Sequence, residues 1–303
     1  MKTDILEEKL EDLAPKNYGL DIEREKAEVS NEDWVFGAIS QPSIVYIPED
    51  EREEYLPLGE IQRGVEDMMD CVTRAYLNKL EADFNWLFRH NRLSLDSRAF
   101  LVENGYPRDD DSQGIEFSDA FIAIKSKTTK SGNSLKAPAQ AIHEFGLVPK
   151  FLLPLESDMT FDDYHNPKRI TPEIERLAKE FTKHFIINYE KVYPDHFEEL
   201  YKEEMIVTAG YAWPDPINGE YPKVDYQPNH SFLGIHRPKH VIFDNYRDTI
   251  DGDFIKKLAS DYNLLEYGYR IFISAEGAVK KNPLGAIGDI FIRLLKALKE
   301  LLT

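Results

Sequence analysis

The amino-acid sequence predicts an α+β fold, with a mainly helical first two thirds and a strand-rich last third. Apolar residues recur every three or four positions from Val65 to Phe84 and from Ile174 to Val192, as on one face of a helix. After Met205, β-branched and aromatic residues gather in short runs such as 269–273, which favour strands. Helical and strand patterns in separate parts of a chain are typical of α+β folds, whereas regular alternation indicates a parallel sheet.

Further elements are expected along the chain, and each of them is short. They are a strand at 42–48, an element that begins within 91–99, an apolar segment at 118–125, a helix at 135–145 that stops at Gly146, and strands near Val207, Tyr211, Phe232 and Val241 to Phe243. Residues 197–204 extend or follow the helix predicted at 174–192.

The chain divides into three predicted parts. Residues 1–30 are charged and form an N-terminal arm or a short pro-segment, and 31–275 form a two-lobed domain. The helical lobe is expected at about 55–205, and the β lobe at about 31–54 and 206–275. In the last part, 276–303, apolar residues between Leu284 and Leu302 share one helical face. This appended amphipathic helix packs on its own domain, on a partner or on a membrane surface.

Composition excludes several classes of protein. The 303 residues carry a formal net charge of -18, which argues against binding to nucleic-acid phosphates. No apolar run is long enough to cross a bilayer, and residues 1–15 do not read as a signal peptide. The single cysteine rules out an intrachain disulfide. We therefore expect a protein made in the cytoplasm.

No motif indicates a cofactor or a metal, so we expect neither. The chain lacks a glycine-rich phosphate loop. Residues 109–114 imitate the start of a calcium loop, but Ala120 stands where a bidentate glutamate is needed. His236 and His240 are spaced like a helical zinc pair, but Pro238 between them argues against a helix.

Cys71 and His230 are the candidate nucleophile and base. A thiol attacks as its thiolate, and both a helix N-terminus and a neighbouring imidazolium lower its pKa. Cys71 lies about one turn into a predicted helix, near Asp67 and Asp70, whose charges oppose thiolate formation. A lone cysteine on a helix is more often an inert, buried small hydrophobe. For His230, the corresponding alternative is a structural histidine whose polar atoms are satisfied by hydrogen bonds.

The orienting group has two candidates, Asp244 and Asn245. His230 stands at the entry to one predicted strand, and these two residues end the next strand along the chain. Side chains alternate along a strand, so only one of the two can face His230. A nucleophile, a base and a group that orients the base form the general arrangement of covalent catalysis.

The order of several short motifs resembles the papain-like (C1-type) cysteine peptidases. The resemblance covers about residues 33–274, and it is strongest to divergent members from tailed bacteriophages and metagenomes. The motifs are Asp-Cys-Val-Thr-Arg-Ala-Tyr at 70–76 with Glu81 downstream, the segments 117–122, 128–135 and 141–149, Asn229-His230, and Phe-Asp-Asn-Tyr at 243–246.

The resemblance implies a papain-like two-lobed fold and a role for each matched residue. Cys71 is then the nucleophile, and His230 the general base and acid. Asp244 matches the orienting Asn of the family because Tyr246 falls where the family has Trp; Asn245 takes that place if the register slips by one. Gln62 is the only candidate donor to an oxyanion, although it stands nine residues before the cysteine rather than the family's six.

Three functional hypotheses follow. The first is a papain-like cysteine hydrolase, a peptidase that forms an acyl-enzyme and acts on a phage structural protein or a bacterial peptide. The second is a bacteriophage structural or accessory protein that keeps an inactive papain-like fold as a scaffold, with 1–30 and 276–303 as contacts to neighbouring subunits. The third is a related Cys-His-Asp transferase. The resemblance also implies a location in the host cytoplasm or the virion.

Overall fold

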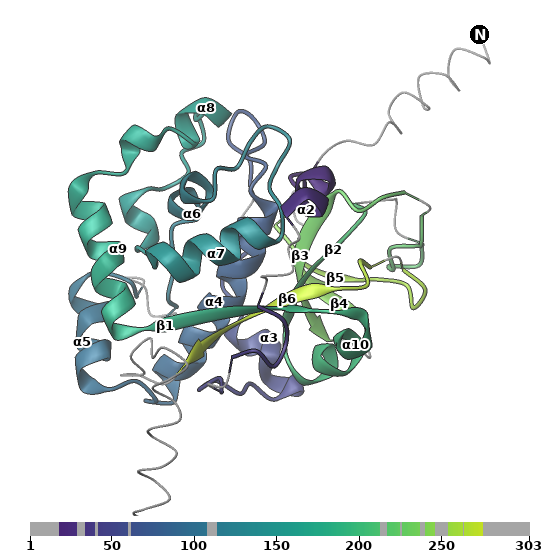
Figure 1. Ribbon diagram of the computed structural model, residues 1–303, viewed down its shortest axis with the longest axis horizontal. Coiled ribbons are helices and arrows are strands. Elements are labelled where there is room, and N and C mark those ends of the chain that lie inside the picture. Colours follow the sequence, from purple (N-terminus) through teal and green to yellow (C-terminus); the bar gives the residue numbers. More distant parts are fainter. Residues whose placement is uncertain are drawn as a thin grey trace, which may run out of the picture.

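A computed structural model describes most of the chain (Figure 1). The described residues are 18–28, 34–39, 42–59, 62–107, 114–212, 217–224, 226–236, 240–245, 254–262 and 264–274. Helices gather on one side of the molecule and an antiparallel sheet on the other, with helix α4 between them (Figure 1). This separation confirms the predicted α+β class.

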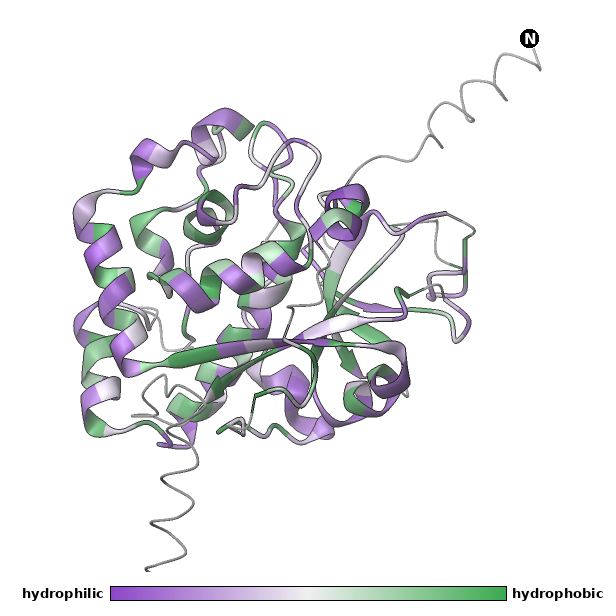
Figure 2. Ribbon diagram, viewed as in Figure 1, coloured by the Kyte–Doolittle hydropathy of each residue, from purple (hydrophilic) through white to green (hydrophobic). Residues whose placement is uncertain are grey.

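Most of the helices precede the sheet in sequence. They are α2 (Ile22–Glu28), α3 (Arg52–Tyr55), α4 (Cys71–Arg89), α5 (Leu95–Glu103), α6 (Asp119–Lys125), α7 (Lys136–Phe145), α8 (Phe161–Tyr164) and α9 (Pro172–His184), with 3-10 turns at Glu49–Glu51, Lys150–Leu152 and Pro167–Arg169. Helix α10 (Pro194–Glu203) lies between the first two strands of the sheet. Hydroxyl side chains cap several N-termini: Ser118 accepts a hydrogen bond from Phe121 N, and Thr171 accepts one from Ile174 N. Along α9, hydrophilic residues alternate with hydrophobic ones, as Figure 2 shows.

Among the described residues, six strands form one antiparallel sheet in the order β1-β6-β2-β3-β4-β5. Their bounds are β1 (Ile186–Val192), β2 (Ile206–Gly210), β3 (His230–His236), β4 (Val241–Phe243), β5 (Ile255–Lys257) and β6 (Gly268–Ser274). Gly210 pairs with His230, and Phe243 pairs with Leu233 on the other side of β3. The register therefore brings the first residue of β3 near the end of β4.

An aromatic cluster fixes the helical side. Phe181 of α9 is fully buried, and its ring lies 4.8 to 6.4 Å from the rings of five others: Phe84, Phe100, Tyr106, Phe117 and Phe185. Edge-to-face and tilted pairs at such separations add to the free energy gained by burying the rings. Through Phe84, the cluster anchors α4 to the other helices of this side.

Two predicted helices have different bounds in the structure. The helix predicted from Val65 begins only at Cys71, because Met69 adopts a positive φ of 53° and its amide donates to Asp67 Oδ1. The helix predicted at 174–192 ends at His184, and Ile186–Val192 pairs with β6 as strand β1. The β-branched and aromatic residues of β1 favour a strand in a sheet over a continuation of the helix.

Other expectations have mixed outcomes. The helix predicted at 135–145 is confirmed as α7, and the strands of the last third are confirmed as β2, β3, β4 and β6. Residues 42–48 form no regular strand; Ser43 makes an isolated bridge to Ser274. The amphipathic helix predicted in 276–303, Tyr246 and the calcium-like segment at 109–113 lie outside the described residues. No helix in the described part of the chain is both long and apolar enough to span a bilayer.

Candidate active site

Cys71 is the first residue of α4. Asp70, immediately before it, is fixed by buried polar contacts: its carboxylate accepts from Arg74 Nε at 3.0 Å and from Tyr164 Oη at 2.8 Å. These bonds hold the start of the helix in place. The unpaired N–H groups and the dipole of a helix N-terminus favour a negative charge there, so α4 places the thiol where a thiolate is stabilised.

His230 and Asp244 form a short, buried pair. His230 is the first residue of β3 and Asp244 follows the last residue of β4, and both side chains have zero solvent exposure. The imidazole donates from Nε2 to Asp244 Oδ1 at 2.6 Å. The other ring nitrogen, Nδ1, lies 3.2 Å from the carbonyl oxygen of Tyr18. An oxygen acceptor therefore faces each nitrogen, as expected for a doubly protonated ring.

The charges around His230 set its protonation. Burial lowers the pKa of His230, but the Asp244 carboxylate and the Cys71 sulfur outweigh this effect and raise the pKa to about 10. The pKa of Asp244 is lowered to about 2, because the charges of His230 and Lys256 outweigh the opposing effect of burial. The geometry thus favours an imidazolium held by a carboxylate.

Cys71 interacts directly with this imidazole. Burial raises the pKa of the thiol, whereas the charge of His230 and a hydrogen bond to it lower the pKa. The backbone N–H of Ser231 also points at Sγ, at 3.4 Å. In this buried state desolvation prevails and the thiol form is favoured. Exposure to water removes that penalty and leaves His230 and the Ser231 N–H, which lower the pKa of the thiol, opposed by the charge of Asp67.

The other two predicted residues have different surroundings. Asn245 is buried and accepts from Asn78 Nδ2 at 3.1 Å, so Asp244, the first of the two alternatives, is the residue that faces the imidazole. Gln62 is fully buried in the loop before α4, where its Nε2 donates to Asp67 Oδ1 at 3.0 Å and its backbone carbonyl oxygen accepts from Met68 N. Gln62 therefore braces this loop in the present structure.

Sequence reasoning missed Lys256 of β5. Its Nζ lies 2.6 Å from Asp244 Oδ2, and its side chain is 1% exposed. The segment Ile255-Lys256-Lys257 contains two adjacent lysines, and the sequence does not say which of them faces inward.

The chain's own residues 18–21 cover Cys71. A Cβ added to Gly19 would lie 3.0 Å from Cys71 Sγ and 2.8 Å from the carbonyl carbon of Met69. Backbone bonds hold the segment on both sides: Tyr18 N and Leu20 N donate to Asn229 O, and Asn133 N donates to Gly19 O. This covering segment explains why the exposure of Cys71 is zero.

Helix α2, which follows the covering segment, fastens it to both lobes. Glu25 is fully buried, and its carboxylate accepts from Leu135 N at 2.7 Å and from Tyr267 Oη at 3.1 Å. Arg24 donates to the carbonyl oxygens of Lys127 and Ser126. Of the predicted arm or pro-segment at 1–30, the part that the structure describes is thus docked across the site.

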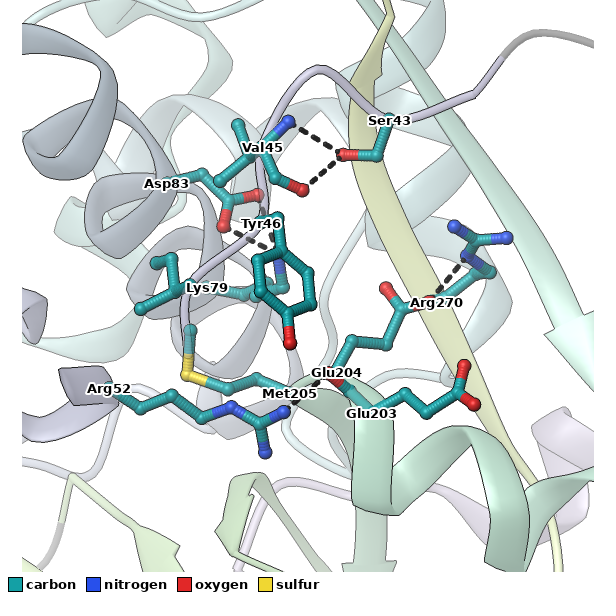
Figure 3. A pocket seen from close by; sticks show the side chains of 11 residues that line it. Ser43, Val45, Tyr46, Arg52, Lys79, Asp83, Glu203, Glu204, Met205 and Arg270 are labelled. Atoms are coloured by element: carbon teal, nitrogen blue, oxygen red, sulfur yellow. Dashed lines mark hydrogen bonds and ion pairs between the residues drawn. The ribbon is translucent and has the colours of Figure 1, made fainter. Parts of the chain in front are cut away.

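A separate polar cavity lies further along α4 (Figure 3). Its volume is about 250 Å³, and four of its charged side chains form two ion pairs: Lys79 with Asp83 at 2.5 Å, and Arg270 with Glu204 at 3.1 Å. Arg52 donates to backbone carbonyls there. The Arg270–Glu204 pair joins β6 to the end of α10, and the bonds of Arg52 join α3 to β3 and α10. Within the described ranges, no group of three or more His, Cys, Asp or Glu side chains could hold a metal ion.

Comparisons with known proteins identify the fold. No protein-family model matches the chain, and no curated protein sequence matches it. Among solved structures, the chain is similar to xylellain, a cysteine protease from Xylella fastidiosa, with a TM-score of 0.50 and 14% identity over 86% of this chain and 96% of that one. It is also similar to the proform of the ragweed pollen cysteine protease Amb a 11, with a TM-score of 0.50 and 11% identity over 90% and 73% of the two chains. The chain therefore has the α+β fold of papain-like cysteine proteases.

Proposed function

We propose that this chain is a cysteine hydrolase that acts on a peptide or protein substrate. The observation that carries the proposal is the connected, buried arrangement of Cys71, His230 and Asp244, with the sulfur at a helix N-terminus. The thiolate of Cys71 attacks a carbonyl carbon, and the leaving amine takes a proton from His230. Water, deprotonated by His230, then attacks the acyl carbon, releases the acid and restores the Cys71 thiolate and the His230 imidazolium.

The form described here is latent. The covering segment occupies the space in front of Cys71, and the carbonyl oxygen of Tyr18 engages His230 Nδ1. A substrate carbonyl cannot approach the sulfur until this segment moves. Displacement or cleavage of the segment therefore precedes turnover.

The test is alkylation of Cys71 at about pH 6, where an ordinary thiol with a pKa near 8.5 is almost wholly protonated. The full chain carrying Gly19→Ala, which is expected to raise the population of the undocked form, is treated with iodoacetamide and followed by intact-mass measurement. We expect fast single labelling that His230→Ala abolishes, and cleavage of fluorescent casein that Cys71→Ser abolishes. Slow labelling that is insensitive to His230→Ala would contradict the proposal.

The second candidate is a catalytically inactive scaffold, favoured by the complete burial of both Cys71 and His230. In that case the covering segment is a permanent part of the core, and the uncovered thiol behaves as an ordinary one in the same assay. A phage structural protein as substrate or partner, and a location in the host cytoplasm or the virion, stay predictions from the sequence resemblance.

A further inference from the structure

Lys256 is a buried cation behind the candidate site. It is the middle residue of β5 and is paired with Ile242 of β4, while its neighbours Ile255 and Lys257 are exposed. Its Nζ contacts Asp244 Oδ2 at 2.6 Å. Removing an ammonium from water is costly unless a partner compensates. The carboxylate that compensates Lys256 is the one that holds His230.

Asp244 is fixed at both oxygens. Oδ1 accepts from His230 Nε2 at 2.6 Å and from Asn245 N at 2.7 Å, while Oδ2 faces Lys256. In the described part of the chain, the ionisable groups near this carboxylate are His230 from β3, Lys256 from β5 and Tyr262 from the segment after β5. The carboxylate cannot rotate without breaking a charge-assisted bond on each side.

On the basis of the proposed function, we propose that Lys256 is a positioning residue of the reaction: it orients Asp244 and neutralises it. The Asp244–Lys256 pair then acts on His230 as a neutral acceptor. In the papain-like resemblance, a neutral Asn occupies this position. The ion pair thus replaces one amide side chain, and the site keeps the same total charge.

The charge balance predicts the effect of removing Lys256. Lys256→Met leaves one uncompensated negative charge beside His230, which disfavours a second negative charge on Cys71. At a separation on the order of 10 Å and an effective dielectric constant of about 20, one unit charge shifts a pKa by roughly one unit. A merely structural lysine would change stability without moving the pH at which the thiolate forms.

The experiment is the pH profile of Cys71 alkylation by iodoacetamide between pH 4 and 9, in the full chain carrying Gly19→Ala. Lys256→Met is expected to move the acid limb of the profile up by roughly one pH unit. Lys256→Met combined with Asp244→Asn exchanges the ion pair for a neutral amide and should return the profile to that of the parent. Lys257→Met is the matched control, since it removes an exposed lysine of the same strand that pairs with Glu220.

The outcomes separate this inference from the proposed function. If the parent lacks a low-pH alkylation phase, the proposed hydrolase site fails. If the parent shows that phase and Lys256→Met behaves like Lys257→Met, the role of Lys256 is refuted. Should Lys256→Met fail to fold, the double variant decides alone: a parent-like profile supports neutralisation, and a profile unlike the parent's overturns it.

Discussion

Substituting Gly19 should uncover the candidate site. Gly19 has a φ of 104°, which is unfavourable for a residue with a Cβ, and the added carbon would lie 2.8 Å from backbone of Met69. Adopting left-handed backbone costs a non-glycine residue about 1–2 kcal/mol, and overpacking adds about 1–3 kcal/mol. Both costs apply only while the covering segment is docked.

Together these costs destabilise the docked form by about 2–5 kcal/mol. This raises the population of the undocked form by roughly 30-fold to a few thousand-fold, since 1.4 kcal/mol corresponds to a factor of ten. We therefore expect Gly19→Ala to speed alkylation of Cys71 by that factor at constant pH, as measured by intact-mass kinetics.

Gly37→Ala provides the matched control for this prediction. Gly37 also has a positive φ, 87°, but an added Cβ there would meet nothing within 4 Å. This variant bears the backbone strain without touching Cys71, and its labelling rate should stay near that of the wild type. Equal rates in the two variants would refute the covering role of residues 18–21.

Three further predictions concern the arm, the ion pair and the core. Glu25→Ala removes two hydrogen-bond acceptors of the docked helix α2, so Cys71 labelling should rise about 5- to 30-fold, for a loss of about 1–2 kcal/mol; exposed Glu23→Ala is the control, and equal rates would contradict the role of Glu25. The raised pKa of His230, about 10, means that its imidazolium stabilises the fold fully below the unfolded pKa of about 6.5 and progressively less as pH rises toward 10. Urea unfolding should accordingly show that the advantage of the wild type over His230→Gln shrinks by a few kcal/mol between pH 6 and pH 10; a constant difference would argue against the ion pair. Phe181→Ala should lower the free energy of unfolding by about 3–5 kcal/mol in the same measurement, because it empties the centre of the aromatic cluster; a loss below about 1 kcal/mol would show that the cluster is not tightly packed.

The sequence by itself determined the class of the fold. The helical periodicity around Leu80 and the β-branched runs near Ile271 are local patterns, and local patterns specify which face of an element is buried. The order of the short motifs also indicated the papain-like architecture and placed Cys71, His230 and Asp244 on three separate elements. These assignments need only the spacing of residues along the chain.

Element boundaries depended on contacts between distant segments. Residues 186–192 continue an apolar pattern that a helix could also bury, and pairing with β6 selects the strand. Likewise, the choice between Asp244 and Asn245 rests on the register of β3 with β4, since a shift of one residue turns every side chain to the opposite face.

The covering segment and Lys256 were decided by tertiary structure alone. Nothing in the sequence around Gly19 shows that it lies against Cys71, and nothing distinguishes Lys256 from Lys257. Both features join segments far apart in the chain, through close packing in one case and a buried charge pair in the other. Such contacts follow from how the lobes assemble, because only the folded chain brings the covering segment, the Cys71 thiol and the Lys256 ammonium into one site that excludes water.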